Sequence, residues 1–378
     1  MFTPILEKNE TDLIGSGKSN EKTKVVVAMS GGVDSSVAAS IIKEHGYDVV
    51  GITLQLFDYG KIGKTKGTCC AGKDIYDAKK VCDKIKIEHQ VMNYEDIFND
   101  EVIEKFADSY IKGETPIPCI DCNQTVKFRD LFKFAKKLNA DALVTGHYVK
   151  RIDKEYPKMY RPNDLDRDQS YFLFSTTQEQ LEYLRFPLAN LSKKETREIA
   201  KKMNLIVANK PDSQDICFVP SGNYKKIIEK LRPESFKKGN IVDKNGKILG
   251  YHNGIVNYTI GQRKGIKISN SEPLFVMKLD TNKNEVVVGN KKDLLVNKIF
   301  LRDLNFLTRN KEDLNNDIMV KVRSTGKLLN CKFNNVRNEI LLDKGEEGVS
   351  PGQACVFYKE DSDGTRVLGG GWIKKTEN

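Results

Sequence analysis

Residues 28–36, Ala-Met-Ser-Gly-Gly-Val-Asp-Ser-Ser, have the composition of an anion-binding turn. They follow the apolar run 25–27 and precede an amphipathic segment at 37–45, which predicts a strand, a tight turn and a helix. Glycine lets a ligand approach the backbone closely, and a helix start offers unpaired N–H groups to an anion. The serine hydroxyls of the motif add donors, and Asp34 is a candidate ligand for Mg²⁺. The segment therefore predicts a phosphate-binding site.

This turn lacks the Gly-Lys-Ser/Thr ending of the common nucleotide loop. It resembles the pyrophosphate loop of enzymes that split ATP between its α and β phosphates and adenylate a substrate. Ser-Gly-Gly also occurs in ordinary turns. The flanking strand and helix, with Asp-Ser-Ser in register, favour the nucleotide interpretation.

Two cysteines stand in polar segments. Cys122 lies in Thr-Pro-Ile-Pro-Cys-Ile-Asp-Cys-Asn, residues 115–123, just before a predicted helix at 126–138. A helix start favours a thiolate, so Cys122 is a candidate nucleophile. Cys217 lies in a polar loop that follows Pro211 and precedes Phe218. Taken singly, a cysteine is more often a small buried apolar residue, but polar, proline-stiffened loops are poor places to hide a thiol.

The other cysteines have structural explanations. Cys82 shares an apolar helical face with Ile75, Ala78 and Ile85, and Cys331 and Cys355 fall in predicted strands. We expect a structural role for the adjacent pair at 69 and 70. The four histidines form no zinc-binding pattern with these cysteines.

The bulk composition limits the class of protein. Lys and Arg number 62 against 52 Asp and Glu, which gives a net charge of +10. This excess favours a polyanionic partner, although a lysine-rich proteome explains it equally well. No apolar run reaches the ~18 residues of a membrane span, and residues 1–22 lack the apolar core of a secretory signal. We expect a cytoplasmic, monomeric protein with reduced thiols and a disordered extension at 1–22.

The hydrophobic pattern predicts three domains after that extension. In residues 23–225, strands at 25–29, 49–56, 89–92 and 142–148 alternate with helices, which predicts an α/β fold with a doubly wound parallel sheet. Ser192 and Glu195 form a capping box that starts a helix at 193–203. Short strands at 239–242, 247–249 and 254–261 indicate a small, mainly β middle domain, 226–295. Strands at 318–323, 328–333, 340–342, 354–358 and 367–372 indicate a C-terminal β-barrel, 296–378.

Several motifs occur together in a characteristic order. Besides the glycine turn and the Cys122 segment, they are Thr-Gly-His-Tyr (145–148), Asp-Gln-Ser-Tyr-Phe-Leu (168–173), Asp-Ser-Gln-Asp-Ile-Cys-Phe (212–218), Tyr-Thr-Ile-Gly-Gln-Arg-Lys-Gly (258–265) and Ser-Pro-Gly-Gln-Ala-Cys-Val-Phe-Tyr (350–358). From about residue 24 to 374 the chain resembles the tRNA-specific 2-thiouridylases, the MnmA family. The resemblance implies a pyrophosphate-loop fold of the adenine nucleotide α-hydrolase type.

The resemblance assigns roles residue by residue. It implies ATP binding by Ala28, Met29, Ser30, Gly31, Gly32, Val33, Asp34, Ser35, Leu54 and Gly146. It implies tRNA binding by Ile117, Pro118, Cys119, His147, Arg167, Asp168, Gln169, Arg323, Ser324 and Gln353. Cys122 matches the nucleophile and Cys217 the cysteine that carries a persulfide.

The implied reaction makes 2-thiouridine at the wobble uridine of the Lys, Glu and Gln tRNAs. ATP, with Mg²⁺, adenylates the C2 oxygen, which makes that oxygen a leaving group as AMP. Sulfur from the Cys217 persulfide reaches C2 directly or as hydrosulfide, and a transient Cys122–Cys217 disulfide forms. A cysteine desulfurase or a sulfur-relay protein would supply the sulfur.

One departure concerns Cys119, because several members carry Asp three residues before the nucleophile. Cys119 is then an alternative resolving thiol, a spectator, or a ligand with Cys122 and Cys217 of an iron–sulfur cluster.

Two other classes of function compete with this interpretation. A pyrophosphate-loop ligase that adenylates a small molecule would not need Cys122 and Cys217. A non-catalytic tRNA-binding protein would not need an intact Ser-Gly-Gly-x-Asp-Ser turn.

Overall fold

The structure is a computed structural model that describes residues 13–57, 70–212, 216–219, 223–315 and 317–378. The chain divides into two compact units. The first contains residues up to 98, 123–170 and 176–214, and the second contains 99–122, 171–175 and 215–378. In the part of the chain that is described, no helix is both long enough and apolar enough to cross a bilayer.

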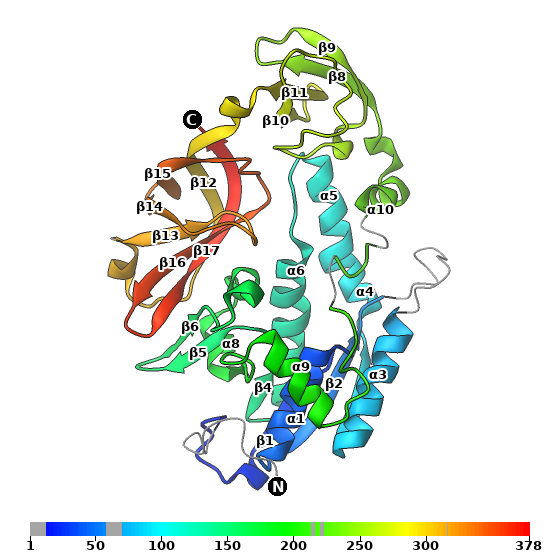
Figure 1. Ribbon diagram of the computed structural model, residues 1–378, viewed down its shortest axis with the longest axis vertical. Coiled ribbons are helices and arrows are strands. Elements are labelled where there is room, and N and C mark those ends of the chain that lie inside the picture. The colour runs from blue at the N-terminus through cyan, green and yellow to red at the C-terminus, as the bar shows by residue number, and fades with distance from the viewer. Residues whose placement is uncertain (1–12, 58–69, 213–215, 220–222, 316) are drawn as a thin grey trace. The chain divides into compact units, whose positions relative to one another are not determined.

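The first unit is built on a five-stranded parallel sheet in the order β3-β2-β1-β4-β7. Figure 1 labels its strands β1, β2 and β4. Its strands are β1 (Lys24–Ala28), β2 (Asp48–Gln55), β3 (Glu88–Asn93), β4 (Ala142–Val144) and β7 (Leu184–Arg185). Val25, Val26 and Val27 at its centre are fully buried, as expected of a parallel strand covered on both faces. Strand β1 pairs with β2 on one side and β4 on the other. The carboxyl ends of β1 and β4 thus meet where the strand order reverses, which is where such sheets bind ligands.

Helices of this unit pack around the sheet. They are α1 (Val33–Glu44), α3 (Cys70–Ile85), α4 (Glu95–Phe98), α7 (Leu131–Lys137), α8 (Gln178–Tyr183) and α9 (Lys193–Lys202). A hairpin of β5 (Lys150–Asp153) and β6 (Pro157–Tyr160) completes the unit. The predicted capping box is present: Ser192 Oγ accepts from the Glu195 N–H, and the Glu195 carboxylate accepts from the Ser192 N–H. Helix α9 therefore begins at the predicted residue.

The second unit contains three groups of elements. Helices α5 (Lys105–Ile111), α6 (Pro118–Asp121) and α10 (Tyr224–Leu231) accompany the π-helix Asn99–Glu104. A four-stranded sheet in the order β10-β11-β8-β9 uses β8 (Lys238–Asp243), β9 (Ile248–Asn253), β10 (Phe275–Asp280) and β11 (Glu285–Gly289). The C-terminal barrel consists of β12 (Leu295–Phe306), β13 (Ile318–Lys321), β14 (Leu329–Asn334), β15 (Glu339–Glu347), β16 (Ala354–Asp361) and β17 (Gly364–Glu377), and pairing of β12 with β17 closes it.

The predicted fold class is confirmed, with local differences. The predicted strand 254–261 is wrong: Gly254 has a φ of 112° and opens the 3-10 helix Ile255–Asn257, whose Asn257 amide donates to the Gly254 carbonyl. The predicted strand 142–148 stops at Val144. Residues 13–22 were expected to be disordered, yet Ile14 is buried against the core of the first unit and its carbonyl accepts from Arg185.

Candidate functional site

The predicted phosphate-binding turn joins β1 to α1. Gly32 precedes α1 with φ −93° and ψ 169°, and no side chain caps the first N–H groups of the helix. Gly31 has a φ of 72°, and a Cβ added there would lie 2.2 Å from the Asp74 carbonyl oxygen. A Cβ at Gly146, just after β4, would lie 2.6 Å from the Ser35 nitrogen. The glycine turn and Gly146 therefore meet at the start of α1, where uncapped N–H groups favour an anion.

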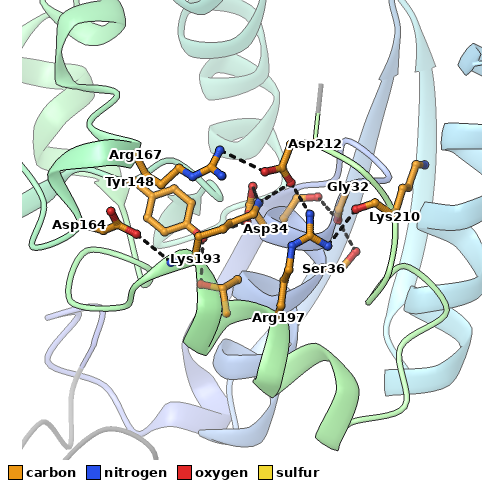
Figure 2. A network of polar contacts seen from close by, with 12 residues as sticks. Gly32, Asp34, Ser36, Tyr148, Asp164, Arg167, Lys193, Arg197, Lys210 and Asp212 are labelled. Atoms are coloured by element: carbon orange, nitrogen blue, oxygen red, sulfur yellow. Dashed lines mark hydrogen bonds and ion pairs between the residues drawn. The ribbon is translucent and has the colours of Figure 1, made fainter. Parts of the chain in front are cut away.

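The hydroxyls of this turn are used differently from the prediction. Ser36 is fully buried and donates to the Gly32 carbonyl at 2.8 Å, so it closes the first turn of the helix (Figure 2). Ser35 accepts from the Ser30 N–H at 3.1 Å and lies 3.1 Å from the Ser30 hydroxyl. The proposal of Ser36 as a ligand donor is therefore wrong, because its hydrogen is committed to the backbone. Ser30 is exposed beside the turn.

Asp34 is the centre of a network of charged groups within the first unit (Figure 2). Both of its carboxylate oxygens accept from Lys193 Nζ, at 2.7 and 2.8 Å. The Tyr148 hydroxyl donates to Asp34 Oδ1 at 3.0 Å. Burial and the Asp34 charge raise the pKa of Tyr148, so this phenol remains a donor at neutral pH.

Asp212 is the second acid of the network. It pairs with Lys193 at 2.8 Å, with Arg197 at 2.6 Å and with Arg167 at 3.1 Å. Burial alone would raise the pKa of Asp212, but the hydrogen bond and charge of Lys193, with the two arginines, lower it. Asp212 therefore stays ionised, and Lys193 joins it to Asp34. Asp212 is also the first residue of the motif at 212–218, which contains Cys217.

Lys210 connects the turn to a neighbouring helix. Its ammonium donates to the Gly31 carbonyl at 2.8 Å, to Asp74 at 2.7 Å and to Asp77 at 2.5 Å. Burial alone would lower the pKa of Lys210, but the bonds to the two carboxylates raise it. Lys210 is therefore charged, and it holds the turn against α3.

Lys193, Arg197 and Lys210 make these contacts, but no sequence motif indicated a role for them. Lys193 and Arg197 belong to the helix that the capping box predicted, and Lys210 precedes Pro211. The only indication of their role in the sequence was their position beside these motifs. A sequence pattern cannot show that Lys193 pairs with an aspartate 159 residues away.

The Cys122 segment begins a helix in the second unit. Pro118 is the first residue of α6, and the Cys122 N–H donates to the Pro118 and Cys119 carbonyls before the chain continues as the π-helix Cys122–Asp130. Cys122 is only 6% exposed, whereas Cys119 is exposed. The expectation that a polar loop leaves this thiol open is wrong, because the residue has entered the helix. Burial raises the pKa of the neighbouring Asp121 to about 6. The charge of Lys105 acts to lower this pKa, and the charge of Glu101 acts to raise it.

The approach to this helix is fastened to the C-terminal barrel of the same unit. Arg302 makes two bonds to the Glu114 carboxylate, at 2.7 and 2.8 Å. The Thr115 N–H donates to the Pro351 carbonyl, and the Gln353 amide donates to the Thr115 carbonyl, each at 2.8 Å. Backbone and side-chain bonds therefore fix the residues that lead into α6.

The Cys217 segment packs on α5. Cys217 itself is exposed, while the next residue, Phe218, is buried with its ring edge-on to Phe106 at 5.3 Å. Tyr110, one turn further along α5, stacks on Tyr224 at 4.4 Å. Residues 213–215 of the predicted motif lie outside the described residues. The ammonium of Lys105, the first residue of α5, acts to lower the pKa of Asp121, which is next to Cys122. Helix α6 contacts the π-helix Asn99–Glu104, which leads into α5.

The remaining cysteines behave as predicted where the structure describes them. Cys82, Cys331 and Cys355 are buried, and burial raises the pKa of Cys82 and of Cys331 to about 12. Cys69 lies outside the described residues, as does the side chain of Cys70. The described cysteines form no disulfide, and the described chain contains no group of three His, Cys, Asp or Glu able to hold a metal. This finding does not support an iron–sulfur cluster held by Cys119, Cys122 and Cys217.

The residues assigned to tRNA by resemblance have varied surroundings. Asp168 is buried, with 2% of its side chain exposed, and pairs with Arg161 at 2.7 Å. Gln169 accepts from the Tyr148 N–H at 2.8 Å. Burial lowers the pKa of His147 to about 3, so this ring is neutral at physiological pH. Arg323 pairs with Glu346 in the barrel, with Ser324 beside it.

Comparison with known proteins identifies the family. Residues 23–221 match the tRNA methyl transferase HUP domain, 225–290 the tRNA methyl transferase PRC-barrel domain, and 296–373 the aminomethyltransferase beta-barrel domain. A tRNA-specific 2-thiouridylase MnmA of Bartonella bacilliformis is 52% identical over 98% of this chain and 95% of its own length. The protein of that name from Bradyrhizobium diazoefficiens is 53% identical over 97% and 94%.

The alignment with a third relative covers that protein's full length. The tRNA-specific 2-thiouridylase MnmA of a Wolbachia strain from Drosophila simulans is 51% identical over 98% of this chain and 100% of its own. Among solved structures, a 4-thiouridine synthetase in complex with RNA and ATP is 20% identical, with a TM-score of 0.37 over 56% of this chain and 51% of that one. That structural similarity is too distant to indicate function. The near-full-length relatives, at 51–53% identity, show that this chain belongs to the family of tRNA-specific 2-thiouridylases.

Proposed function

We propose that this chain is a tRNA-uridine 2-sulfurtransferase that makes 2-thiouridine at the wobble position of the Lys, Glu and Gln tRNAs. The observation that carries the proposal is identity of 51–53% to named 2-thiouridylases along nearly the whole chain. The nucleotide turn and the two cysteine-bearing segments give that chemistry a physical basis. No comparable feature favours a small-molecule ligase.

ATP is the substrate that activates the uracil. Its phosphates would lie at the uncapped start of α1, beside Gly31, Gly32 and Ser30, and its adenine against Leu54 on β2. Attack of the uracil C2 oxygen on the α-phosphorus forms a C–O–AMP bond and releases pyrophosphate. The oxygen then leaves C2 as part of AMP, a far better leaving group than oxide.

The donor set at this turn fits Mg²⁺. Mg²⁺ is usually held by one or two carboxylates together with substrate phosphates and waters, and Asp34 supplies a carboxylate beside the turn with 32% of its side chain exposed. The ion would offset negative charge on the phosphates. Lys193 and Tyr148 position the Asp34 carboxylate for that role.

Two thiols handle the sulfur. The terminal sulfur of a persulfide on Cys217 forms the new bond to C2, and AMP departs. Cys122 attacks the Cys217 sulfur, which breaks the bond to the terminal sulfur and leaves a Cys122–Cys217 disulfide. A thiol reductant restores both groups before the next turnover. The exposed position of Cys217 suits loading by a cysteine desulfurase or relay protein. Phe218 packs on Phe106 of α5, and helix α6 contacts the π-helix that leads into α5, which supports a meeting of the two cysteines within the second unit.

The partner is a tRNA whose target base leaves its stack to reach the site. We assign the contacts to Ile117, Pro118, Cys119, His147, Arg167, Asp168, Gln169, Arg323, Ser324 and Gln353, several of which also stabilise the site internally. Because the substrates are tRNA and ATP, we expect the reaction in the cytoplasm.

A thiolation assay tests the function. Purified protein is incubated with unmodified tRNA, ATP, Mg²⁺ and a desulfurase with cysteine, and the RNA is separated on a mercury-containing gel that retards thiolated species. We expect retarded tRNA with the wild type and none with Cys217→Ser or Cys122→Ser. The matched control is Cys82→Ala, which removes a buried thiol of high pKa and should retain thiolation.

Two results would overturn the proposal. Normal thiolation by Cys217→Ser from the desulfurase donor would remove the persulfide role. Release of pyrophosphate at the full rate without tRNA, with a small molecule as acceptor, would favour the ligase instead. Cys119→Ser distinguishes a resolving thiol from a spectator. If Cys119 is a spectator, this variant should thiolate tRNA like the wild type.

A further inference from the structure

Lys193 holds the carboxylate that we assign to the metal, and this inference rests on the proposed use of ATP. The ammonium of Lys193 makes three short contacts, two to Asp34 and one to Asp212, at 2.7–2.8 Å. An ammonium has three hydrogens, so these contacts use its full donor capacity. Only 11% of the side chain is exposed. A cation thus already sits where Mg²⁺ would bind Asp34.

The backbone of Lys193 is fixed, while its side chain has an alternative partner. Its N–H donates to Asp164 at 2.9 Å, and the capping box of Ser192 and Glu195 holds the first turn of α9. The flexible four-carbon stem can therefore move the ammonium away from Asp34 without moving the helix. Asp212 would retain it after such a movement.

Asp34 also remains held when Lys193 leaves. The Tyr148 hydroxyl donates to Asp34 Oδ1 and lies 2.9 Å from Thr196 Oγ1, on the same helix as Lys193. That bond leaves Asp34 Oδ2 open to another cation. The site therefore provides two arrangements of the same groups, one with Lys193 on Asp34 and one with a metal ion in its place.

We propose that Lys193 makes metal binding at Asp34 depend on nucleotide. In the absence of ATP the lysine competes with Mg²⁺ for the carboxylate. When ATP binds at the start of α1, its phosphates pair with the Lys193 ammonium in place of Asp34. The Asp34 carboxylate then becomes available to the metal ion that arrives with the nucleotide. Lys193 thus binds phosphate when ATP is present and competes with the metal ion for Asp34 when ATP is absent. The other lysine at this helix start, Lys194, is exposed and has no such role.

Binding measurements test this inference without turnover. Mn²⁺ replaces Mg²⁺ and is counted by electron paramagnetic resonance, and an ATP analogue with a methylene group between the α and β phosphates is titrated by calorimetry. Wild type should bind Mn²⁺ at Asp34 only with the analogue. Lys193→Met should bind Mn²⁺ without it and bind the analogue about ten- to a hundredfold more weakly, as expected when a charged hydrogen bond is lost. Lys194→Met is the matched control and should equal wild type.

The outcomes separate this inference from the proposed function. If the wild type does not bind the analogue, the proposed use of ATP fails and this inference fails with it. If the wild type binds it and Lys193→Met binds analogue and Mn²⁺ identically, only the inference fails. Should Lys193→Met not fold, Lys193→Arg gives the answer, because it keeps the charge but fits Asp34 differently: altered Mn²⁺ affinity without nucleotide supports the proposal, and unaltered affinity refutes it.

Discussion

Gly31 and Gly32 are adjacent in the motif, but we expect their alanine variants to behave oppositely. Gly31 has a φ of 72°, a conformation that costs an L-residue roughly 1–2 kcal/mol. Its added Cβ would also meet the Asp74 carbonyl at 2.2 Å, where real contacts essentially never fall below 3.0 Å. Overpacking of this kind typically adds about 1–3 kcal/mol. Gly31→Ala should therefore destabilise the nucleotide-free protein by about 2–5 kcal/mol.

Gly32 is the matched control for this effect. Its φ of −93° and ψ of 169° suit any residue, and an added Cβ meets only the Ser30 hydroxyl at 3.4 Å. Gly32→Ala should leave the stability within about 0.5 kcal/mol of wild type, as is usual for a substitution without a structural conflict. If phosphate approaches this backbone, the same variant should lose nucleotide affinity, because the new methyl group occupies that approach.

Calorimetric unfolding without nucleotide and titration with the ATP analogue measure the two effects separately. At roughly 2–4 °C per kcal/mol for a unit of this size, Gly31→Ala should lower the unfolding temperature of the first unit by about 4–20 °C. Unfolding of Gly31→Ala at the wild-type temperature, or equal destabilisation by Gly32→Ala, would contradict this prediction. Unchanged nucleotide affinity in Gly32→Ala would place the phosphates elsewhere.

Three further predictions concern charge and packing. Lys210→Met should lower the free energy of unfolding by about 1–3 kcal/mol, because Asp74 and Asp77 lose their shared cation; denaturant titration measures this, and an unchanged midpoint would contradict it. The raised pKa of Asp121 means that the folded protein binds this proton more tightly, so the contribution of Asp121 to stability should fall as pH rises from about 4 to 6. Asp121→Asn should remove that slope, and an identical pH profile would refute the assignment. Phe218→Ala should cost about 3–5 kcal/mol and reduce thiolation; full activity in the gel assay would show that the Cys217 segment needs no such anchor.

The local elements were predictable because their signals are local. The apolar run at 25–27 and the capping box of Ser192 with Glu195 placed β1 and α9 within a residue. The glycine turn and the amphipathic segment at 37–45 indicated α1, which begins earlier, at Val33. The alternation of strands and helices was enough to predict the parallel sheet, in which the carboxyl ends of β1 and β4 are neighbours. The ordered motifs were enough to indicate the family that the comparisons then identified.

Contacts between distant residues depended on the tertiary structure. Lys193 meets Asp34 only because α9 packs against α1, and Lys210 reaches Gly31 from 179 residues away. Cys122 is buried although its segment is polar, because Pro118 begins helix α6 and tertiary packing covers the end of that helix. Residue types and short spacings are written in the chain, but ion-pair partners, exposure and pKa shifts are properties of the folded surroundings, which a linear pattern does not contain.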